Sequence, residues 1–344
     1  MSRSRKLRIL ILMDETFMPP DRVEESFDLT TAKWKMEWDV YAALCNLGHE
    51  VRKLGLRDDL GKLRDALVEF EPHIAFNLIE DFHDFRIFDQ HVVSYLELVQ
   101  QPYTGCNPRG LTLARDKALT KKIMAYHRIA VPAFAVFPKR RKIVRPKKLE
   151  FPLLVKSVNV EGSVGIAQSS VVYDDQKLKE RVQFIHESLG TYAIAEQYID
   201  GRELYVGVMG NLRLRTFPTW EMIFANLPEG VPRIATDRVK TSHAYQQRWG
   251  IVSQRAEPLP RCVEEQIPHL CKRIYRILGL TGYARLDFRL TADNQLYLLE
   301  ANPNPQIAYG EDFAESAEAD GLSYGELLQQ IMNLGLSYSP DILV

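Results

Sequence analysis

The stretch that decides the fold runs from Gly282 to Asn302: Gly-Tyr-Ala-Arg-Leu-Asp-Phe-Arg-Leu, then Thr-Ala-Asp-Asn-Gln, then Leu-Tyr-Leu-Leu-Glu-Ala-Asn. Two β-rich runs flank the turn residues Asp293 and Asn294, which predicts an antiparallel hairpin. Side chains alternate along a strand, so the charged residues of the first run share one face and its apolar residues share the other. The charged face holds Arg285, Asp287 and Arg289; the apolar face holds Ala284, Leu286, Phe288 and Leu290.

In the return strand, alternation places Glu300 and Asn302 on one face, together with Leu296 and Leu298. A loop centred on Asp293-Asn294 sets Asp287 opposite Glu300 and Arg285 opposite Asn302. Directly opposed side chains have Cβ atoms about 4.5–5.5 Å apart, and two opposed anions repel.

A bound cation would remove that penalty. Carboxylate and amide oxygens suit Mg²⁺ held together with substrate phosphates. We therefore predict a metal site at Asp287, Glu300 and Asn302. The alternative is a surface hairpin whose acids pair with Arg285 and Arg289.

A second group of residues combines a lysine with a glycine-containing loop. The apolar run Phe151–Lys156 delivers the lysine, and Glu161-Gly-Ser-Val-Gly165 follows shortly after. Glycines let backbone N–H groups approach a phosphate, and a lysine adds a point charge. The pattern differs from the GxxxxGK[ST] loop, which disfavours a P-loop NTPase. A plain strand and turn remains the alternative.

A third group lies around a glycine turn in Ala195–Leu204, which contains Glu196 and Glu203. The two oxygens of Glu203 could accept two hydroxyl protons, as a ribose requires. The alternative is a strand-edge carboxylate in a salt bridge.

The first hundred residues predict a parallel sheet. Strands expected at 7–13, 51–54 and 74–79 alternate with helices expected at 34–45 and 58–70. This order is typical of a sheet covered by helices on both faces. No GxGxxG motif is present, so a Rossmann dinucleotide site has no support.

From Phe151 onward, short strands are grouped and helices segregate, which favours an α+β arrangement. Strands are expected at 153–156, 193–199, 204–210, 284–290 and 296–301, and helices near 175–189 and 262–278. Pro268 inside the latter predicts a kink or a later start. Ser323 and Glu326 form a capping box that opens a final helix.

Composition excludes several protein classes. The 344 residues have 46% hydrophobic content and a net charge of −1, which gives no global attraction to nucleic acid or to a membrane. No apolar run approaches the roughly 18 residues that span a bilayer. Four separated cysteines predict reduced thiols and a cytoplasmic protein. Seven basic residues within 139–148 form either a solvated linker or a docking patch for an acidic partner.

Together, these motifs resemble the ATP-grasp superfamily and, within it, the D-alanine–D-alanine ligase family. The resemblance covers about residues 102 to 334. It rests on Pro102-Tyr-Thr-Gly105, Asp116-Lys-x-x-x-Lys121, Val155-Lys156, Glu161–Gly165, Glu196–Glu203, Lys240, Arg285-Leu-Asp287 and Leu298-Leu-Glu-Ala-Asn-Pro303.

The resemblance implies an ATP-grasp fold with α/β and α+β parts, in which two lobes enclose ATP. The implied domains are an N-terminal α/β domain (1–115), a central subdomain (116–205) and a C-terminal subdomain with the metal and catalytic residues (206–344). Implied ATP ligands are Lys117, Lys156, Glu161, Ser163, Glu196, Gln197, Tyr198, Ile199 and Glu203. Implied Mg²⁺ ligands, with Mn²⁺ as an alternative, are Asp287, Glu300 and Asn302; implied catalytic residues are Arg285 and Lys240.

The implied reaction is ATP-dependent amide formation through an acyl-phosphate, with a small-molecule or peptide acid and an amine as substrates. Two segments depart from the family pattern: Met13–Pro20, with Glu15 and Glu37 as replacement ammonium-binding acids, and Asn302–Ala308. We therefore expect substrates other than two D-alanines. The alternatives are an ATP-grasp kinase and a non-catalytic ATP-binding protein. A homodimer is expected by analogy alone.

Overall fold

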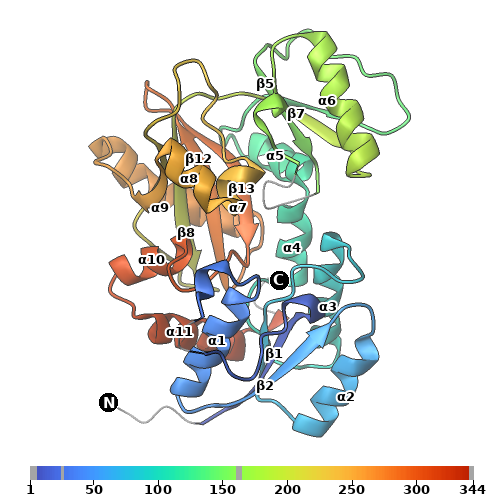
Figure 1. Ribbon diagram of the computed structural model, residues 1–344, viewed down its shortest axis with the longest axis vertical. Helices are drawn as coiled ribbons and strands as arrows, with labels where there is room; N and C mark the ends of the chain where they lie inside the picture. Colours follow the sequence, from blue (N-terminus) through green and yellow to red (C-terminus); the bar gives the residue numbers. More distant parts are fainter. Residues whose placement is uncertain (1–5, 25–26, 160–164, 341–344) are drawn as a thin grey trace.

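The chain is built around three β-sheets, stacked along its long axis (Figure 1). The computed structural model describes residues 6–24, 27–159 and 165–340, without the side chains of residues 240 and 241. Within these ranges, no helix is both long and apolar enough to cross a membrane. All four cysteine thiols are free.

The N-terminal sheet is parallel, as predicted, with strand order β2-β1-β3 (Glu50–Leu56, Arg8–Asp14 and Ile74–Asn77). Helix α1 (Lys35–Asn46) covers one face, where its Val40 joins a core with Ile9 and Ile11. Helices α2 (Leu60–Phe70) and α3 (Asp89–Leu98) cover the other, where Leu10 and Leu12 are buried. Alternate residues of β1 therefore serve two separate cores.

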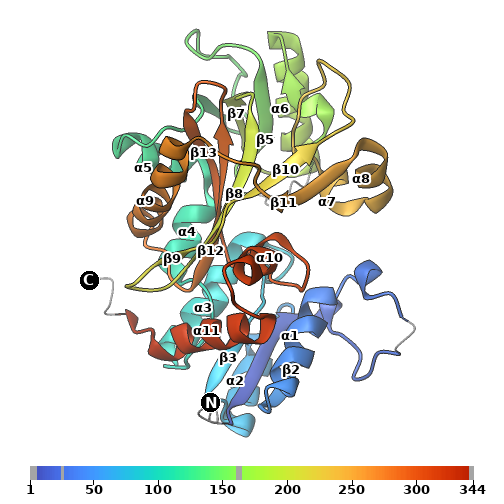
Figure 2. The same cartoon turned by 90° about the vertical axis from the view of Figure 1, so that its left-hand side faces the viewer.

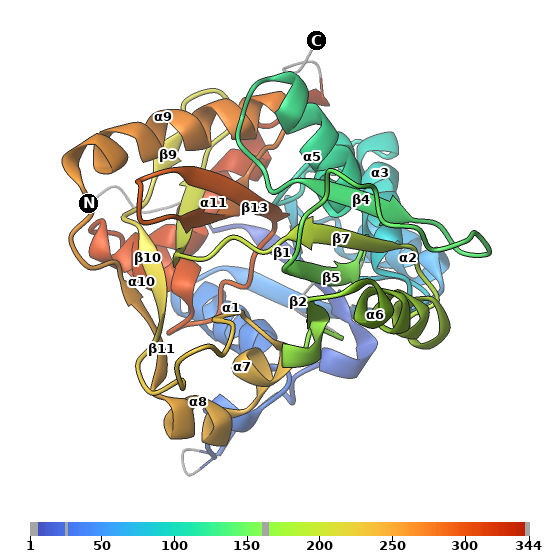
Figure 3. The same ribbon diagram turned by 90° about the horizontal axis from the view of Figure 1, so that it is seen from above.

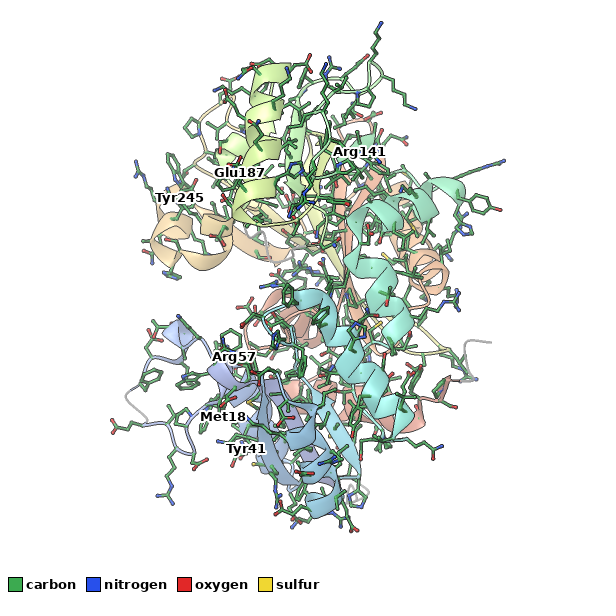
Figure 4. All side chains as sticks on the ribbon, turned by 90° about the vertical axis from the view of Figure 1, so that its right-hand side faces the viewer. Met18, Tyr41, Arg57, Arg141, Glu187 and Tyr245 are labelled. Carbon is green, nitrogen blue, oxygen red and sulfur yellow. The ribbon has the colours of Figure 1, made fainter. Side chains whose placement is uncertain are left out.

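The central sheet is antiparallel, in the order β4-β7-β5-β6 (Phe134–Phe137, Ala193–Gln197, Leu153–Ser157 and Val171–Val172). Helix α6 (Asp175–Ser188) packs on it through Leu178, Val182 and Ile185. The basic run lies between β4 and β5, and Figure 4 places its Arg141 in the lobe far from Tyr41 of α1. Arg145 of this run pairs with Asp175 at 2.8 Å.

The third sheet has strand order β11-β10-β8-β12-β13, with β9 beside β8 (Figure 2). The bounds are Ile251–Arg255, Trp220–Phe224, Arg202–Met209, Tyr283–Leu290, Leu296–Pro303 and, for β9, Arg215–Thr216. Helix α9 (Arg261–Ile277) buries an apolar face against it and starts well before Pro268, so the predicted later start is wrong. Helix α11 (Tyr324–Ser337) begins at the predicted Ser323–Glu326 capping box.

The β12–β13 hairpin has the predicted pairs Asp287–Glu300 and Arg285–Asn302. The predicted face of Leu296 and Leu298 is wrong. A β-bulge shifts the register between Asp287 and Phe288, so that Phe288 pairs with Leu298. One extra residue reverses the alternation of the return strand. Leu296 and Leu298 consequently join the core that contains Phe288, on the face opposite Glu300.

Short helices connect the sheets. The segment 230–250 contains two of them, α7 (Asp237–Thr241) and α8 (His243–Trp249). The other helices are α4 (Pro108–Arg115), α5 (Lys117–Tyr126), α10 (Asp312–Ala319) and four 3₁₀ turns (Glu15–Phe17, Leu29–Thr31, Arg86–Phe88 and Gln168–Ser170). The domain limits 1–115, 116–205 and 206–344 stay a prediction; β8 of the third sheet begins at Arg202.

Candidate active site

A cleft lies between the central sheet and the third sheet, lined by residues of β5, β7 and the β12–β13 hairpin. Figure 3 shows β5, β7 and β13 from above. Gly201 sits at the connection between β7 and β8 with φ +145°, and a Cβ there would come within 2.2 Å of the Leu290 carbonyl oxygen. A larger residue would therefore clash with the end of β12, the strand beside β8 in the third sheet. Eight of the predicted site residues line the cleft: Lys156, Glu196, Gln197, Tyr198, Ile199, Glu203, Asp287 and Glu300.

The hairpin supplies the acidic side of the cleft. Arg285 donates from Nε to Asp287 Oδ1 at 2.8 Å and from Nη2 to Oδ2 at 3.0 Å. Asn302 Nδ2 donates to Asp287 Oδ2 at 2.9 Å. Lys117 Nζ lies 3.0 Å from Glu300 Oε1. Each of the two opposed acids is thus balanced by its own cation.

Both readings of the hairpin have a counterpart in the structure. Asp287 pairs with Arg285, as the alternative expected, but it is only 8% exposed and is no surface residue. Arg289, the other expected partner, pairs with Glu203 instead, at 2.6 Å. Asp287 is therefore buried and Glu300 half-buried, and the metal site stays a prediction.

The basic side of the cleft is built on one shared carboxylate. Lys156 Nζ lies 3.2 Å and Lys121 Nζ 3.5 Å from Glu196 Oε2. Lys121 also donates to the Leu299 carbonyl at 2.9 Å and so ties α5 to the hairpin. The other oxygen, Glu196 Oε1, is buried without a hydrogen-bond partner. It is an acceptor available to a donor on a ligand.

The two lysines differ in the direction of their pKa shifts. Burial lowers the pKa of Lys121 to about 8, despite attraction by Glu196. Burial also acts to lower the pKa of Lys156, but the attraction of Glu196 and Glu300 outweighs it, and the pKa is raised. Lys156 therefore keeps its proton to a higher pH than Lys121 does.

The predicted ribose ligand, Glu203, is 6% exposed. Its Oε2 accepts from Arg289 and its Oε1 accepts from Tyr205 Oη at 2.8 Å. A carboxylate oxygen has two lone pairs, so each can still accept a hydroxyl proton. Arg289 also donates to the Gly201 carbonyl at 2.8 Å, which fixes Glu203 beside the sheet connection.

Three predicted residues lie partly or wholly outside the described part of the chain. Glu161 and Ser163 fall among residues 160–164, which are not described. Lys240 belongs to α7, but its side chain is not described. Their predicted roles stay predictions.

The sequence did not assign four neighbours of the site. Lys121 was part of a motif shared with the family but had no assigned role. Arg289 was predicted on the correct face, but its ion pair with Glu203 was not predicted. Tyr205 and Asp312 carried no signal, although their side chains reach Glu203 and Arg285. These contacts join strands and helices far apart in sequence, so spacing along the chain could not reveal them.

The donors fit a magnesium ion. Asp287 and Glu300 present carboxylate oxygens from directly paired positions of two adjacent strands, and Asn302 lies two residues beyond Glu300 in β13. Across residues 6–24, 27–159 and 165–340, no three His, Cys, Asp or Glu side chains are grouped for a metal. The set contains only two acids, so substrate oxygens would have to complete the coordination, as is usual for Mg²⁺ beside phosphates.

A side pocket opens next to the cleft and shares Tyr205 with it. Its lining includes Arg285, Asn302, Glu80, Arg86, Glu311 and Asp312.

Of the two acids proposed from sequence for an ammonium group, Glu15 is exposed and lies 3.3 Å from Lys62. Glu37 is 3% exposed, and its Oε2 has no hydrogen-bond partner. The carboxylates of Glu80 and Asp14 act on it electrostatically. Of the two acids, Glu37 is therefore the buried one, and its role toward an ammonium group stays a prediction.

Burial, together with the nearby acids, raises the pKa of Glu37 to about 8. The folded protein then keeps a proton that the unfolded chain loses above its usual pKa, so this contribution to stability is lost as the pH rises through 8. We expect the difference in unfolding free energy between Glu37→Gln and the unmodified protein to grow by about 3–4 kcal/mol in favour of the variant from pH 5 to pH 9. One pKa unit corresponds to about 1.4 kcal/mol. Urea unfolding at both pH values measures this gain. Glu50→Gln, at an exposed strand position, is the control and should show no gain; an equal difference at both pH values for Glu37→Gln would refute the assignment.

The comparisons with known proteins agree on the family to which this chain is similar. The family model described as "D-ala D-ala ligase C-terminus" matches residues 123–333. A D-alanine–D-alanine ligase of Bordetella petrii is 33% identical over 245 residues, 69% of each chain. An uncharacterized protein of Sinorhizobium fredii, y4sG, is 29% identical over 307 residues, 86% of this chain and 85% of its own.

Among solved structures, a D-alanine–D-alanine ligase from Bacillus anthracis complexed with ATP has a TM-score of 0.73 at 22% identity. The match covers 96% of this chain and 97% of that one. The predicted ATP-grasp fold is confirmed, and this chain belongs to the D-alanine–D-alanine ligase family.

Proposed function

We propose that the protein binds ATP and Mg²⁺ in the cleft and joins a carboxylic acid to an amine through an acyl-phosphate. One observation carries the proposal: the cross-strand pair Asp287–Glu300 faces the same cleft as Lys156 and Glu196. A metal-binding face and a phosphate-binding lysine therefore meet in one space.

The nucleotide fits the remaining groups of the cleft. The buried, unpartnered Glu196 Oε1 suits the exocyclic amino group of adenine, which donates hydrogen bonds. Glu203 can accept ribose hydroxyls, and Lys117 and Lys156 can neutralise phosphate oxygens.

Each residue then has a chemical task. Mg²⁺, when bound by Asp287, Glu300 and Asn302, would offset negative charge on the phosphates. Arg285, fixed on Asp287, holds a positive charge where the acyl-phosphate forms. Desolvation acts to lower the pKa of Arg285, but Asp287 and Asp312 raise it well above its ordinary value. The guanidinium therefore keeps its charge throughout the reaction.

The substrates are proposed to differ from two D-alanines. A 3₁₀ turn, Glu15–Phe17, directly follows β1, and its Glu15 points to Lys62 rather than to the cleft. The relatives named D-alanine–D-alanine ligase make two D-alanines the first pair to test. Efficient synthesis of D-alanyl-D-alanine would contradict this part of the proposal.

The test is a screen of acid and amine pairs by release of ADP and orthophosphate, followed by mass measurement of the product. A ligase releases both only when acid and amine are present together. A product that retains the phosphate would identify a kinase. Binding of ATP without turnover by any pair would favour a non-catalytic protein. Neither of these results is expected.

A further inference from the structure

We infer that Lys121 is a positioning residue of the active site, one that fixes the proposed nucleotide-binding wall and the proposed metal-binding hairpin relative to each other. The inference rests on the proposed function, because it concerns how that site is held in place. Lys121 belongs to the motif Asp116-Lys-x-x-x-Lys121, and the proposed function gives it no task. It is 1% exposed, and the cleft lining, as far as the structure describes it, does not include Lys121. Lys121 therefore acts on a bound ligand through its neighbours.

Helix α5 presents two lysines on one face. Lys117 and Lys121 are four residues apart, so their side chains lie one above the other along the helix. Both are buried, and they reach consecutive residues of β13. Lys117 pairs with the Glu300 carboxylate at 3.0 Å, and Lys121 donates to the Leu299 carbonyl at 2.9 Å. One face of α5 thus holds β13 both at a proposed metal ligand and at the residue before it.

Leu299 is the residue that the β-bulge leaves without a partner. The register skips it between Leu298 and Glu300, so it has no place in the ladder with β12. A backbone group outside the ladder and shielded from water needs another hydrogen-bond partner. Lys121 supplies a donor for the Leu299 carbonyl, and the Leu298 amide donates to the Ala130 carbonyl, shortly after α5, at 2.9 Å. The position of the bulge, and of Glu300 beside it, therefore depends on α5.

The same ammonium group lies beside the carboxylate proposed to recognise adenine. Lys121 Nζ is 3.5 Å from Glu196 Oε2, and Lys156 Nζ is 3.2 Å from the same oxygen. Two ion pairs on Oε2 restrict the rotation of the carboxylate. The other oxygen, Glu196 Oε1, has no hydrogen-bond partner and is left as the acceptor for a ligand. Lys121 therefore helps to keep this acceptor in place.

One buried cation thus joins parts of the site that lie on different sheets. Glu196 belongs to β7 of the central sheet, and Leu299 belongs to β13 of the third sheet. Burying an ammonium group is costly unless it is paired and hydrogen-bonded, and Lys121 meets this need at these two groups. An uncharged side chain of similar length would fill the space and release both. Base recognition and metal binding should then weaken together, although neither loses a direct ligand.

The test replaces Lys121 with Met and measures two binding properties of the full chain at pH 7, below the Lys121 pKa of about 8. The first is discrimination between ATP and inosine triphosphate, which carries a carbonyl oxygen in place of the adenine amino group. Calorimetric titration with Mg²⁺ should show the ratio of the two dissociation constants falling about tenfold, the effect of about 1.4 kcal/mol.

The second property is Mn²⁺ binding in the presence of inorganic triphosphate, which has no base to meet Glu196. Electron paramagnetic resonance should show Lys121→Met binding Mn²⁺ about tenfold more weakly than the unmodified protein. Lys122→Met, at the next and exposed position of α5, is the matched control and should leave both properties unchanged.

A purely structural role predicts a different result: a lower melting temperature of Lys121→Met with unchanged nucleotide discrimination and unchanged Mn²⁺ binding. That result would overturn the inference, and so would a change in only one of the two properties. Should Lys121→Met fail to fold, Lys121→Met with Glu196→Gln removes the buried carboxylate together with one of its cations. Mn²⁺ binding with triphosphate should then still be about tenfold weaker than in Glu196→Gln alone, and equal binding would overturn the inference. Neither measurement needs turnover, so a failed ligase screen would reject the proposed reaction while both still decide on Lys121.

Discussion

Replacing Asp287 with Asn is expected to lower kcat for ATP-dependent amide formation by about 10³-fold, the scale of losing a main electrostatic group of an active site. The substitution removes one of the two acids on the proposed metal-binding face and leaves Arg285 without its two-pronged partner. ADP release with the acid and amine found by the screen measures the rate. Electron paramagnetic resonance of Mn²⁺ with ATP measures metal binding separately, and we expect both to fall.

Asp293→Asn is the matched control for this variant. It makes the same substitution in the same hairpin, at the exposed turn where Asp293 accepts a hydrogen bond from Thr291. Activity and metal binding should stay at the level of the unmodified protein. If Asp287→Asn kept more than about a tenth of the activity, the proposed metal site would be wrong.

Replacing Lys156 with Met is expected to raise the KM for ATP about 100-fold, since a charge-assisted contact of 1.5–3 kcal/mol is lost. The same change leaves the buried Glu196 with Lys121 alone, whose pKa is lowered to about 8. We therefore expect a lower melting temperature as well. Nucleotide titration and thermal unfolding measure the two effects.

A double variant separates these two effects. Lys156→Met with Glu196→Gln removes the buried charge together with its partner, so stability should partly recover while ATP binding stays weak. Lys177→Met, at an exposed position of helix α6, breaks only the surface pair with Glu180 and serves as the control. Full recovery of ATP binding in the double variant would show that Lys156 acts through stability alone.

The sequence predicted the parallel sheet and the pairing of Asp287 with Glu300, because both follow from local periodicity and turn residues. The faces of Leu296 and Leu298 could not be predicted, because a single inserted residue changes the register without altering the composition of the strand. The ion pair of Arg289 with Glu203 depends on which strands become neighbours in the sheet, which alternation within one strand does not specify.

The bulge in the β12–β13 hairpin also bears on how the gene can vary. Loss of the codon for Leu299 would leave a regular ladder in which Glu300 still pairs with Asp287 and Leu298 with Phe288. Loss of the codon for Leu286, inside the regular part of β12, would instead turn the wrong side chains toward the cleft. The five-residue connection from Thr291 to Gln295 contains exposed positions, where gain or loss of a residue leaves the alternation of both strands intact. In a library of single-codon deletions, loss of Leu286 should therefore abolish function, whereas loss of Ala292 or Asn294 should be tolerated far more often.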